Sequence, residues 1–115
     1  LFALAASFVV VAALRHGAEW RRDLLAYLAG NRDCVQAAVA SLPRLSMAPV
    51  EATYLAWIDA RGLGVDRPAA YLENHGIGLS EGADFGAPGW VRLNFGCTRA
   101  TLEAALARLA AGCSG

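Results

Sequence analysis

Apolar residues dominate the first forty positions of the chain and recur at helical intervals. Between residues 3 and 42 there is no proline, Ala and Leu are abundant, and only Gly17 and Gly30 interrupt the run. Apolar residues that share one helix face recur every three or four positions, at Trp20, Leu24, Tyr27 and Leu28. This spacing predicts a long amphipathic helix that packs on one side. The Gly30-Asn31 pair either ends this helix or kinks it, and Pro43 stops the helical pattern.

The opening segment, Leu1 to Leu14, is apolar except for Ser7. It is shorter than the roughly 20 residues that a membrane-spanning helix requires. A secretory signal would carry basic residues before its apolar run, whereas the first basic residue of this chain is Arg15. We therefore predict a buried helix and no membrane association. Because the chain does not begin with Met, we expect it to be a fragment of a larger protein.

The second half of the chain alternates between strand and helix patterns. Thr53–Asp59 is short, aromatic and β-branched, which favours a strand. Asp66 is placed to cap a helix whose body is Ala69–His75 and which Gly76 closes. Ile77–Pro88 holds three glycines and predicts a short strand followed by a long loop.

Val91–Phe95 forms the second clear strand pattern. Thr98 is placed to cap a final helix. An apolar stripe runs along that helix, at Leu102, Leu106 and Leu109. The order helix, strand, helix, strand, helix predicts an α+β fold.

Composition narrows the functional classes. Hydrophobic residues make up 57% and charged residues 17%, which is too apolar for a disordered chain and rich for a freestanding domain of 115 residues. We therefore expect part of the surface to meet a partner or a missing domain. Ten basic and ten acidic residues are dispersed along the chain, so we predict no nucleic-acid partner.

Lysine is absent, and all ten basic residues are arginine. An enzyme that works through a Schiff base needs a lysine amine, so this chain alone cannot perform that chemistry. The three cysteines, Cys34, Cys97 and Cys113, are odd in number and form no CxxC pair. They indicate reduced, cytoplasmic thiols rather than a disulfide framework or a metal site. The arginine-rich, lysine-free usage is typical of a GC-rich bacterial genome.

Four blocks of the chain carry a family resemblance. They are Arg15–Trp20 with Leu25–Asp33, then Thr53–Asp59, then Gly78–Gly86, then Val91–Phe95 leading into the final helix. In this order they resemble the C-terminal small domain of fold-type-I, pyridoxal-phosphate (PLP)-dependent enzymes of aminotransferase class I/II, specifically the MalY/PatB type of cystathionine beta-lyase. The resemblance spans nearly the whole chain, so residues 1–115 are interpreted as one small domain.

The resemblance implies a small, mostly antiparallel sheet with helices packed on one face. It also implies a dimeric cytoplasmic enzyme whose separate large domain holds the PLP and its lysine. In the family, the arginine of the Arg-Leu-Asn strand binds the α-carboxylate of the amino-acid substrate, and Arg92 occupies that place here. A planar guanidinium pairs with a carboxylate through two parallel hydrogen bonds, which a lysine cannot reproduce. No catalytic or metal-binding residue is expected within this chain.

Other conspicuous residues are interpreted as structural. Arg99 also resembles a recurrent family position, but at a helix start we expect it to pack or form an ion pair. His16 and His75 are expected to be structural, and Trp57 and Tyr54 to be core or interface aromatics, with the mouth of the active site as the alternative.

The chain departs from the family pattern before the first strand. Val50-Glu51-Ala52 stands where the family usually has Pro-Glu-Gly, so the loop is expected to sit differently. The parent enzyme is expected to cleave the carbon-sulfur bond of cystathionine or a cysteine conjugate. An amino-acid aminotransferase and a non-catalytic interaction module remain the alternatives.

Overall fold

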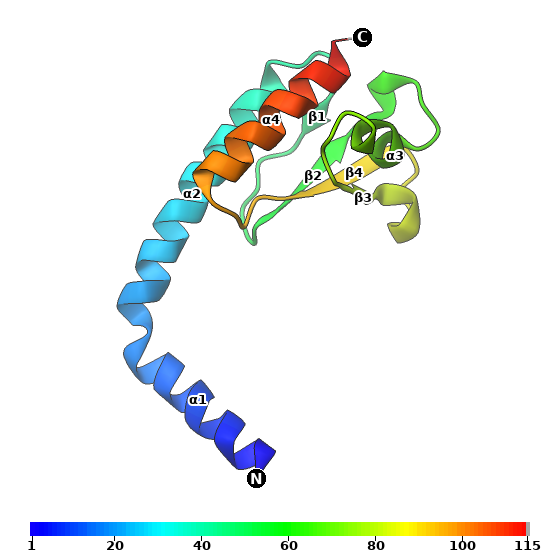
Figure 1. The fold of residues 1–115 in the computed structure, drawn as a ribbon. Helices are drawn as coiled ribbons and strands as arrows, with labels where there is room; N and C mark the ends of the chain where they lie inside the picture. Colours follow the sequence, from blue (N-terminus) through cyan, green and yellow to red (C-terminus); the bar gives the residue numbers. More distant parts are fainter. Residues whose placement is uncertain (115) are drawn as a thin grey trace.

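A computed structural model of the chain describes residues 1–114. It is an α+β structure, as predicted, in which helices occupy both ends of the described chain and a sheet lies between them (Figure 1). The elements, including two 3₁₀ helices labelled η, are α1 (Phe2–His16), α2 (Ala18–Ala40), β1 (Ser46–Met47), β2 (Leu55–Asp59), η1 (Arg61–Leu63), α3 (Pro68–Glu73), β3 (Ser80–Glu81), η2 (Gly82–Phe85), β4 (Trp90–Asn94) and α4 (Arg99–Cys113).

The four strands form one fully antiparallel sheet in the order β1-β2-β4-β3. The two longest strands lie at the centre, where Trp57 of β2 is directly opposite Arg92 of β4. On the other side of β4, Ser80 of β3 is also opposite Arg92. The prediction missed the short strand β1, because two residues are too few to show an alternating pattern.

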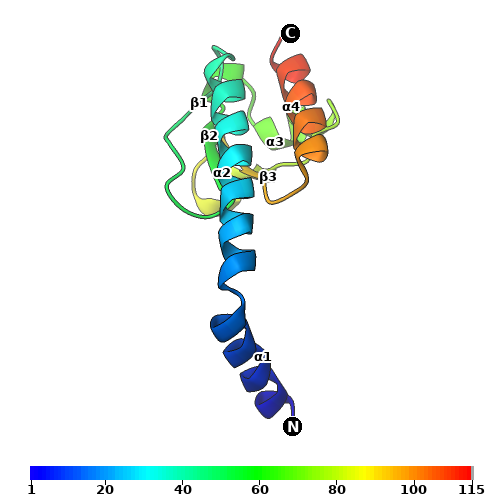
Figure 2. The same ribbon diagram turned by 90° about the vertical axis from the view of Figure 1, so that its left-hand side faces the viewer.

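Helices cover one face of this sheet, as the family resemblance implied. Alternate residues of the central strands, Ala56, Ile58, Val91 and Leu93, are 0 to 3% exposed and form part of the core. The second half of α2 and all of α4 lie side by side over them (Figures 1 and 2). Since side chains alternate along a strand, the intervening residues point to the opposite face, which none of the α-helices within residues 1–114 covers.

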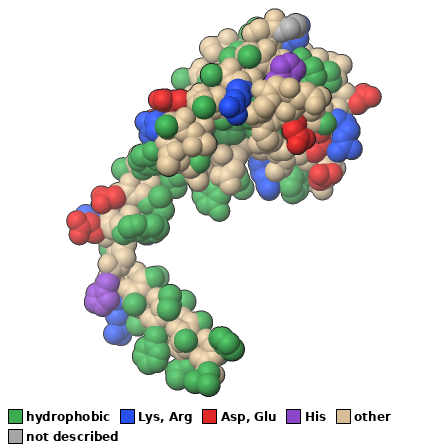
Figure 3. All heavy atoms as spheres, in the orientation of Figure 1, with side chains coloured by type: hydrophobic (Ala, Val, Ile, Leu, Met, Phe, Trp, Pro, Cys, Tyr) green, Lys and Arg blue, Asp and Glu red, His purple; other side chains and the backbone are tan. Residues whose placement is uncertain are grey.

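The first helix departs from the prediction, because α1 is not buried. None of its residues is buried, and its apolar side chains are displayed along a helix that projects from the body (Figure 3). The projection gives the chain a radius of gyration of 17.1 Å, against about 13 Å for a compact chain of this length. Trp20, on the predicted apolar face of α2, is also 70% exposed. The apolar surface expected from the composition is therefore concentrated at this end.

No single described helix is long and apolar enough to cross a membrane. The bent pair of α1 and α2 passes that test only when the two helices are taken together, by length and composition alone.

The break in the N-terminal helical region lies at Gly17, where α1 and α2 meet at an angle of 74°. The expected end or kink at Gly30-Asn31 was wrong, because α2 continues through both residues to Ala40. A side chain at position 17 would collide with the carbonyl oxygen of Ala13, so glycine permits this bend. At position 30 the missing side chain instead makes room for the guanidinium of Arg99. Gly30 therefore serves close packing rather than a kink.

Helix caps show one confirmed and one wrong prediction. The Thr98 side chain accepts a hydrogen bond from the Thr101 amide and caps α4, as expected. Asp66 does not cap α3, whose N-cap residue is Arg67 without a side-chain hydrogen bond. The buried Glu81 of β3 instead accepts hydrogen bonds from the first amides of α3. A distant carboxylate thus satisfies the helix start, which a local capping pattern cannot reveal.

Candidate functional site

The uncovered face of the sheet carries an unusual concentration of aromatic and charged side chains. Because directly opposed residues in antiparallel strands point to the same side, the pairing registers define this face. The registers place eight residues on it: Ser46, Leu55, Trp57, Asp59, Ser80, Trp90, Arg92 and Asn94. We refer to these eight residues as the open sheet face.

Arg92 lies at the centre of this face and is held on two sides. One terminal nitrogen donates a hydrogen bond of 3.3 Å to the Ser80 hydroxyl oxygen. The central guanidinium carbon lies 4.6 Å from the centroid of the Phe85 ring. Among the described residues Arg92 has no carboxylate partner. Since a guanidinium carries five N–H donors, most of its hydrogen-bonding capacity is still available.

The aromatic side chains form a continuous row beside Arg92. Phe85 meets Trp57 edge-on, with ring centroids 6.2 Å apart and an interplanar angle of 77°. Trp57 in turn stacks on Trp90 at 5.8 Å and 15°. Trp57 was expected to be a core or interface aromatic; it is not a core residue, since it is 36% exposed and shares a face with Arg92, and the interface role stays a prediction. Offset and edge-on contacts of this kind hold large rings in fixed positions.

The Trp90 end of this row lies beside an ion pair between Arg61 and Asp59. Arg61 lies 5.6 Å from the centroid of the Trp90 ring, and one of its terminal nitrogens is 2.7 Å from an Asp59 carboxylate oxygen. The hydrogen bonds from the Arg61 guanidinium lower the pKa of Asp59 below its ordinary value. Asp59 is thus paired with Arg61, so its charge is already matched.

The turn η2 places Phe85 against Arg92. A side chain at Gly82 would overlap with the carbonyl oxygens of Ala87 and Trp90, so only glycine allows this turn to close against β4. Gly86 then ends the turn at φ +81, in the left-handed region that favours glycine. The sequence predicts a long loop for this stretch and does not mark Phe85 as part of the site.

A second feature overlooked in the sequence is the buried Asn31 of α2. Its side-chain nitrogen donates hydrogen bonds of 2.9 Å to the carbonyl oxygens of Phe95 and Cys97, just after β4. Its side-chain oxygen accepts a bond of 2.6 Å from Nε of Arg99. The available signal was its helical spacing, since Asn31, Val35 and Val39 form the buried stripe of α2.

Arg99 packs and donates hydrogen bonds but forms no ion pair among the described residues. Its guanidinium also lies 5.1 Å from the centroid of the Tyr27 ring. The expected packing role is therefore the one observed. Arg99 and Asn31 together attach the end of β4 to α2, which holds the strand that carries Arg92.

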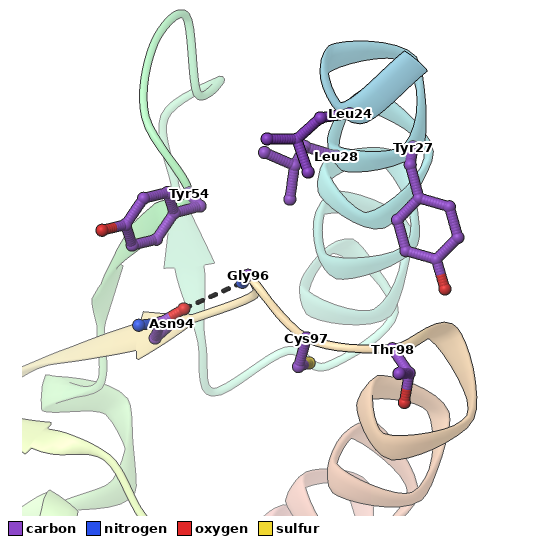
Figure 4. Close-up of a pocket in the computed structure, with 8 residues that line it drawn as sticks. All are labelled: Leu24, Tyr27, Leu28, Tyr54, Asn94, Gly96, Cys97 and Thr98. Atoms are coloured by element: carbon purple, nitrogen blue, oxygen red, sulfur yellow. Dashed lines mark hydrogen bonds between the residues drawn. The ribbon is translucent and has the colours of Figure 1, made fainter. Parts of the chain in front are cut away.

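Two open pockets flank Tyr54 between α2 and the end of β4. The larger, of about 490 Å³, is bounded by Leu24 and Leu28 of α2 and by Tyr54, with Asn94 also in its lining (Figure 4). Tyr54 is 48% exposed, so it is not a core residue of this chain. The smaller pocket, of about 330 Å³, is lined in part by the divergent Val50–Ala52 loop.

The backbone angles of the Val50–Ala52 loop show whether position 52 requires glycine. Ala52, which replaces a family glycine, does not adopt a positive φ, so the position does not demand glycine conformationally. Thr53 does, at φ 69. Its hydroxyl oxygen accepts a hydrogen bond from the Leu55 amide, which supports the turn into β2.

The histidines and cysteines lie outside the open sheet face, and Cys97 lines the larger pocket. His75 contacts the Tyr71 ring at 4.8 Å, and its Nδ1 lies 3.1 Å from the Tyr71 carbonyl oxygen. His16 ends the exposed helix α1. All three cysteines are free thiols, and burial raises the pKa of Cys113. Within residues 1–114, no group of three His, Cys, Asp or Glu side chains is arranged to hold a metal ion.

Two helices, a four-stranded antiparallel sheet and a final helix together match the small domain of solved aminotransferase-fold structures. The chain belongs to the aminotransferase class I and II family, whose model matches residues 1–109. The family predicted from the sequence is therefore confirmed.

Among curated relatives, protein MalY of Escherichia coli strain K12 is 36% identical over 105 residues, covering 86% of this chain and 27% of MalY. Cystathionine beta-lyase PatB of Bacillus subtilis strain 168 is 31% identical over 111 residues, covering 91% of this chain and 29% of PatB. The chain thus spans less than a third of the length of these relatives.

Two solved structures show the same fold. The crystal structure of OvoB matches with a TM-score of 0.88 and 49% identity, over 90% of this chain and 27% of that chain. The PLP-bound C-S lyase from Staphylococcus hominis matches with a TM-score of 0.80 and 25% identity, over 90% of this chain and 29% of that chain.

The residues of this chain do not fit the attachment of PLP. The cofactor binds covalently to a lysine amine, and the chain contains no lysine. We assign none of the described residues to holding it. What the open sheet face offers is a guanidinium suited to a carboxylate.

Proposed function

We propose that this chain is the C-terminal small domain of a PLP-dependent carbon-sulfur beta-lyase that acts on cystathionine or a related cysteine conjugate. The relative PatB carries the name cystathionine beta-lyase, and the S. hominis structure is that of a PLP-bound C-S lyase. The rest of the enzyme would supply the lysine and the cofactor. When bound, PLP would serve as the electron sink for the reaction.

The observation that carries this proposal is the environment of Arg92. Its guanidinium is part-buried on a face that no described α-helix covers, and it has no carboxylate partner among residues 1–114. An amino-acid substrate presents an α-carboxylate, which a guanidinium binds through two parallel hydrogen bonds. We propose that Arg92 binds and orients that carboxylate, while the row of aromatic rings beside it keeps water from one side of the substrate.

An amino-acid aminotransferase is the second candidate. The family model that matches the chain is that of class I and II aminotransferases, and such enzymes need the same carboxylate clamp. Product analysis of the full-length enzyme separates the two. A lyase releases a thiol, ammonia and a keto acid from L-cystathionine, whereas an aminotransferase needs a second keto acid and leaves the carbon-sulfur bond intact.

We further propose that the full-length enzyme is a cytoplasmic homodimer. Three free cysteines suit a reducing compartment, and the exposed apolar side chains of α1 suit burial against the rest of the enzyme or a second subunit. Sedimentation of the full-length protein tests the dimer, and a monomer at micromolar concentration would contradict it.

The test of the proposed carboxylate clamp is the pair of variants Arg92→Ala and Arg92→Lys in the full-length, PLP-loaded enzyme. Each should lose about 2 to 5 kcal/mol in kcat/KM for L-cystathionine, because the lost bond is charge-assisted and bidentate. The dissociation constant of S-methyl-L-cysteine should rise, while that of its decarboxylated analogue 2-(methylsulfanyl)ethylamine should not. Equal changes for both ligands, or none for either, would contradict the assignment.

A further inference from the structure

We propose that Phe85, assisted by Ser80, is a positioning residue that orients Arg92 for carboxylate binding. This inference rests on the proposed function and adds to it the contacts that fix the orientation of the Arg92 guanidinium. The two contacts constrain different parts of the group. The Phe85 ring lies 4.6 Å from the guanidinium carbon, and the Ser80 hydroxyl accepts a hydrogen bond of 3.3 Å from one terminal nitrogen.

Positioning matters here because an arginine side chain has many rotamers. A bidentate carboxylate clamp requires the plane of the guanidinium to be set before the ligand arrives, or the ordering cost is subtracted from binding. An aromatic ring within about 6 Å restricts the guanidinium by cation–π attraction. It does so without using N–H donors, so those that Ser80 does not occupy remain for a ligand.

Phe85 combines an exposed position with a fixed ring. The residue is 55% exposed in the described chain, although phenylalanine is usually a core residue. The ring is nonetheless fixed, since it meets Trp57 edge-on and stands at the end of η2. The turn that holds it is specified by Gly82, whose position admits no side chain.

Ser80 is placed by strand register rather than by chance proximity. It is directly opposite Arg92 in the pairing of β3 with β4, and the next residue, Glu81, anchors β3 to the start of α3. The strand that carries the serine is therefore fixed at two points. Phe85 and Ser80 thus approach Arg92 from parts of the chain that are each held independently.

The experiment is a double-mutant cycle between Phe85 and Arg92 in the full-length, PLP-loaded enzyme. Phe85→Leu keeps an apolar side chain but removes the ring, and it should raise the KM for L-cystathionine about 3- to 30-fold with a smaller change in kcat. Phe85→Tyr, which keeps the ring, should restore the KM to within about twofold. In the Arg92→Ala background the effect of Phe85→Leu should disappear, because Phe85 acts through Arg92.

Two further measurements keep the test decisive. The dissociation constant of S-methyl-L-cysteine should rise in Phe85→Leu while that of 2-(methylsulfanyl)ethylamine stays unchanged, an effect that general loosening of the fold would not give. Should Phe85→Leu fold poorly, Phe85→Met provides the same comparison. Ser80→Ala should also raise the KM for L-cystathionine.

The outcomes separate this inference from the proposed function. Suppose that Arg92→Ala weakens binding of S-methyl-L-cysteine but not of 2-(methylsulfanyl)ethylamine, while Phe85→Leu changes neither dissociation constant. The positioning role of Phe85 is then overturned, and the carboxylate-binding role of Arg92 stands. The same holds if Phe85→Leu has equal effects with and without Arg92. If Arg92→Ala itself shows no selectivity for the carboxylate, the proposed function fails first.

Discussion

The side-chain oxygen of Asn31 on α2 accepts a 2.6 Å hydrogen bond from Nε of Arg99 at the start of α4. The two residues are 68 positions apart in the chain, and the Asn31 side chain is fully buried. Its amide nitrogen also holds two carbonyl oxygens beyond the end of β4. One side chain thus connects α2, the segment after β4, and α4.

Replacing Asn31 should therefore destabilise the domain. Asn31→Leu keeps the number and branching of side-chain heavy atoms but leaves two carbonyl oxygens and the Arg99 guanidinium without their partner, at a cost of about 2 to 4 kcal/mol. Denaturant unfolding followed by circular dichroism measures the loss. Asp33→Asn, two residues along the same helix with a 65% exposed carboxylate, is the matched control and should change stability by less than about 0.5 kcal/mol. Equal effects of the two variants would refute a special role for Asn31.

Two glycines on either side of β3, Gly78 and Gly82, offer a second test. Gly82→Ala forces a methyl group against the carbonyl oxygens of Ala87 and Trp90, and it should cost about 1 to 3 kcal/mol. Gly78→Ala meets open space and has no positive φ, so it should be neutral or slightly stabilising. Thermal unfolding of both variants checks this difference. A Gly82→Ala protein as stable as Gly78→Ala would show that η2 is not packed as described.

The ion pair of Asp59 with Arg61 predicts a specific pH dependence. The pKa of Asp59 is lowered in the folded state, so the stabilisation from the pair is fully present above the unfolded pKa of about 3.9 and is lost as the pH falls through the folded value. Asp59→Asn should thus lower the unfolding temperature slightly at pH 7 and have a smaller effect at pH 3. Asp66→Asn, at an exposed carboxylate with no ion pair among the described residues, serves as the control. If the unfolding temperature of Asp59→Asn fell further below that of the parent protein as the pH decreased, the prediction would be contradicted.

The exposed helix α1 should govern the solution behaviour of the isolated chain. Because α1 contributes no buried residue, a chain of residues 18–115 should keep its unfolding temperature. It should nevertheless self-associate less and bind less of a dye that reports apolar surface. Sedimentation and dye fluorescence of the two chains test this. If self-association were unchanged after removal of α1, the apolar surface responsible for it would lie elsewhere in the chain.

The sequence by itself determined the elements whose signals are local. Short runs of strand-favouring residues marked the two central strands, Thr98 before an apolar helical stripe marked a helix cap, and the absence of lysine excluded attachment of PLP to this chain. The motif around Arg92 indicated the family, which the comparison with the family model confirms. These features depend on a few neighbouring residues, so periodicity and residue type suffice to identify them.

Only the tertiary structure decided the features that depend on contacts between distant segments. Gly17 and Gly30 look alike in sequence, yet one bends the helix and the other admits Arg99 from across the fold. Glu81 rather than Asp66 satisfies the start of α3, and Phe85 meets Arg92 through a turn that resembles an ordinary loop in the sequence. Local patterns specify which backbone conformations are favourable, whereas the packing of remote side chains decides which of them places functional groups together.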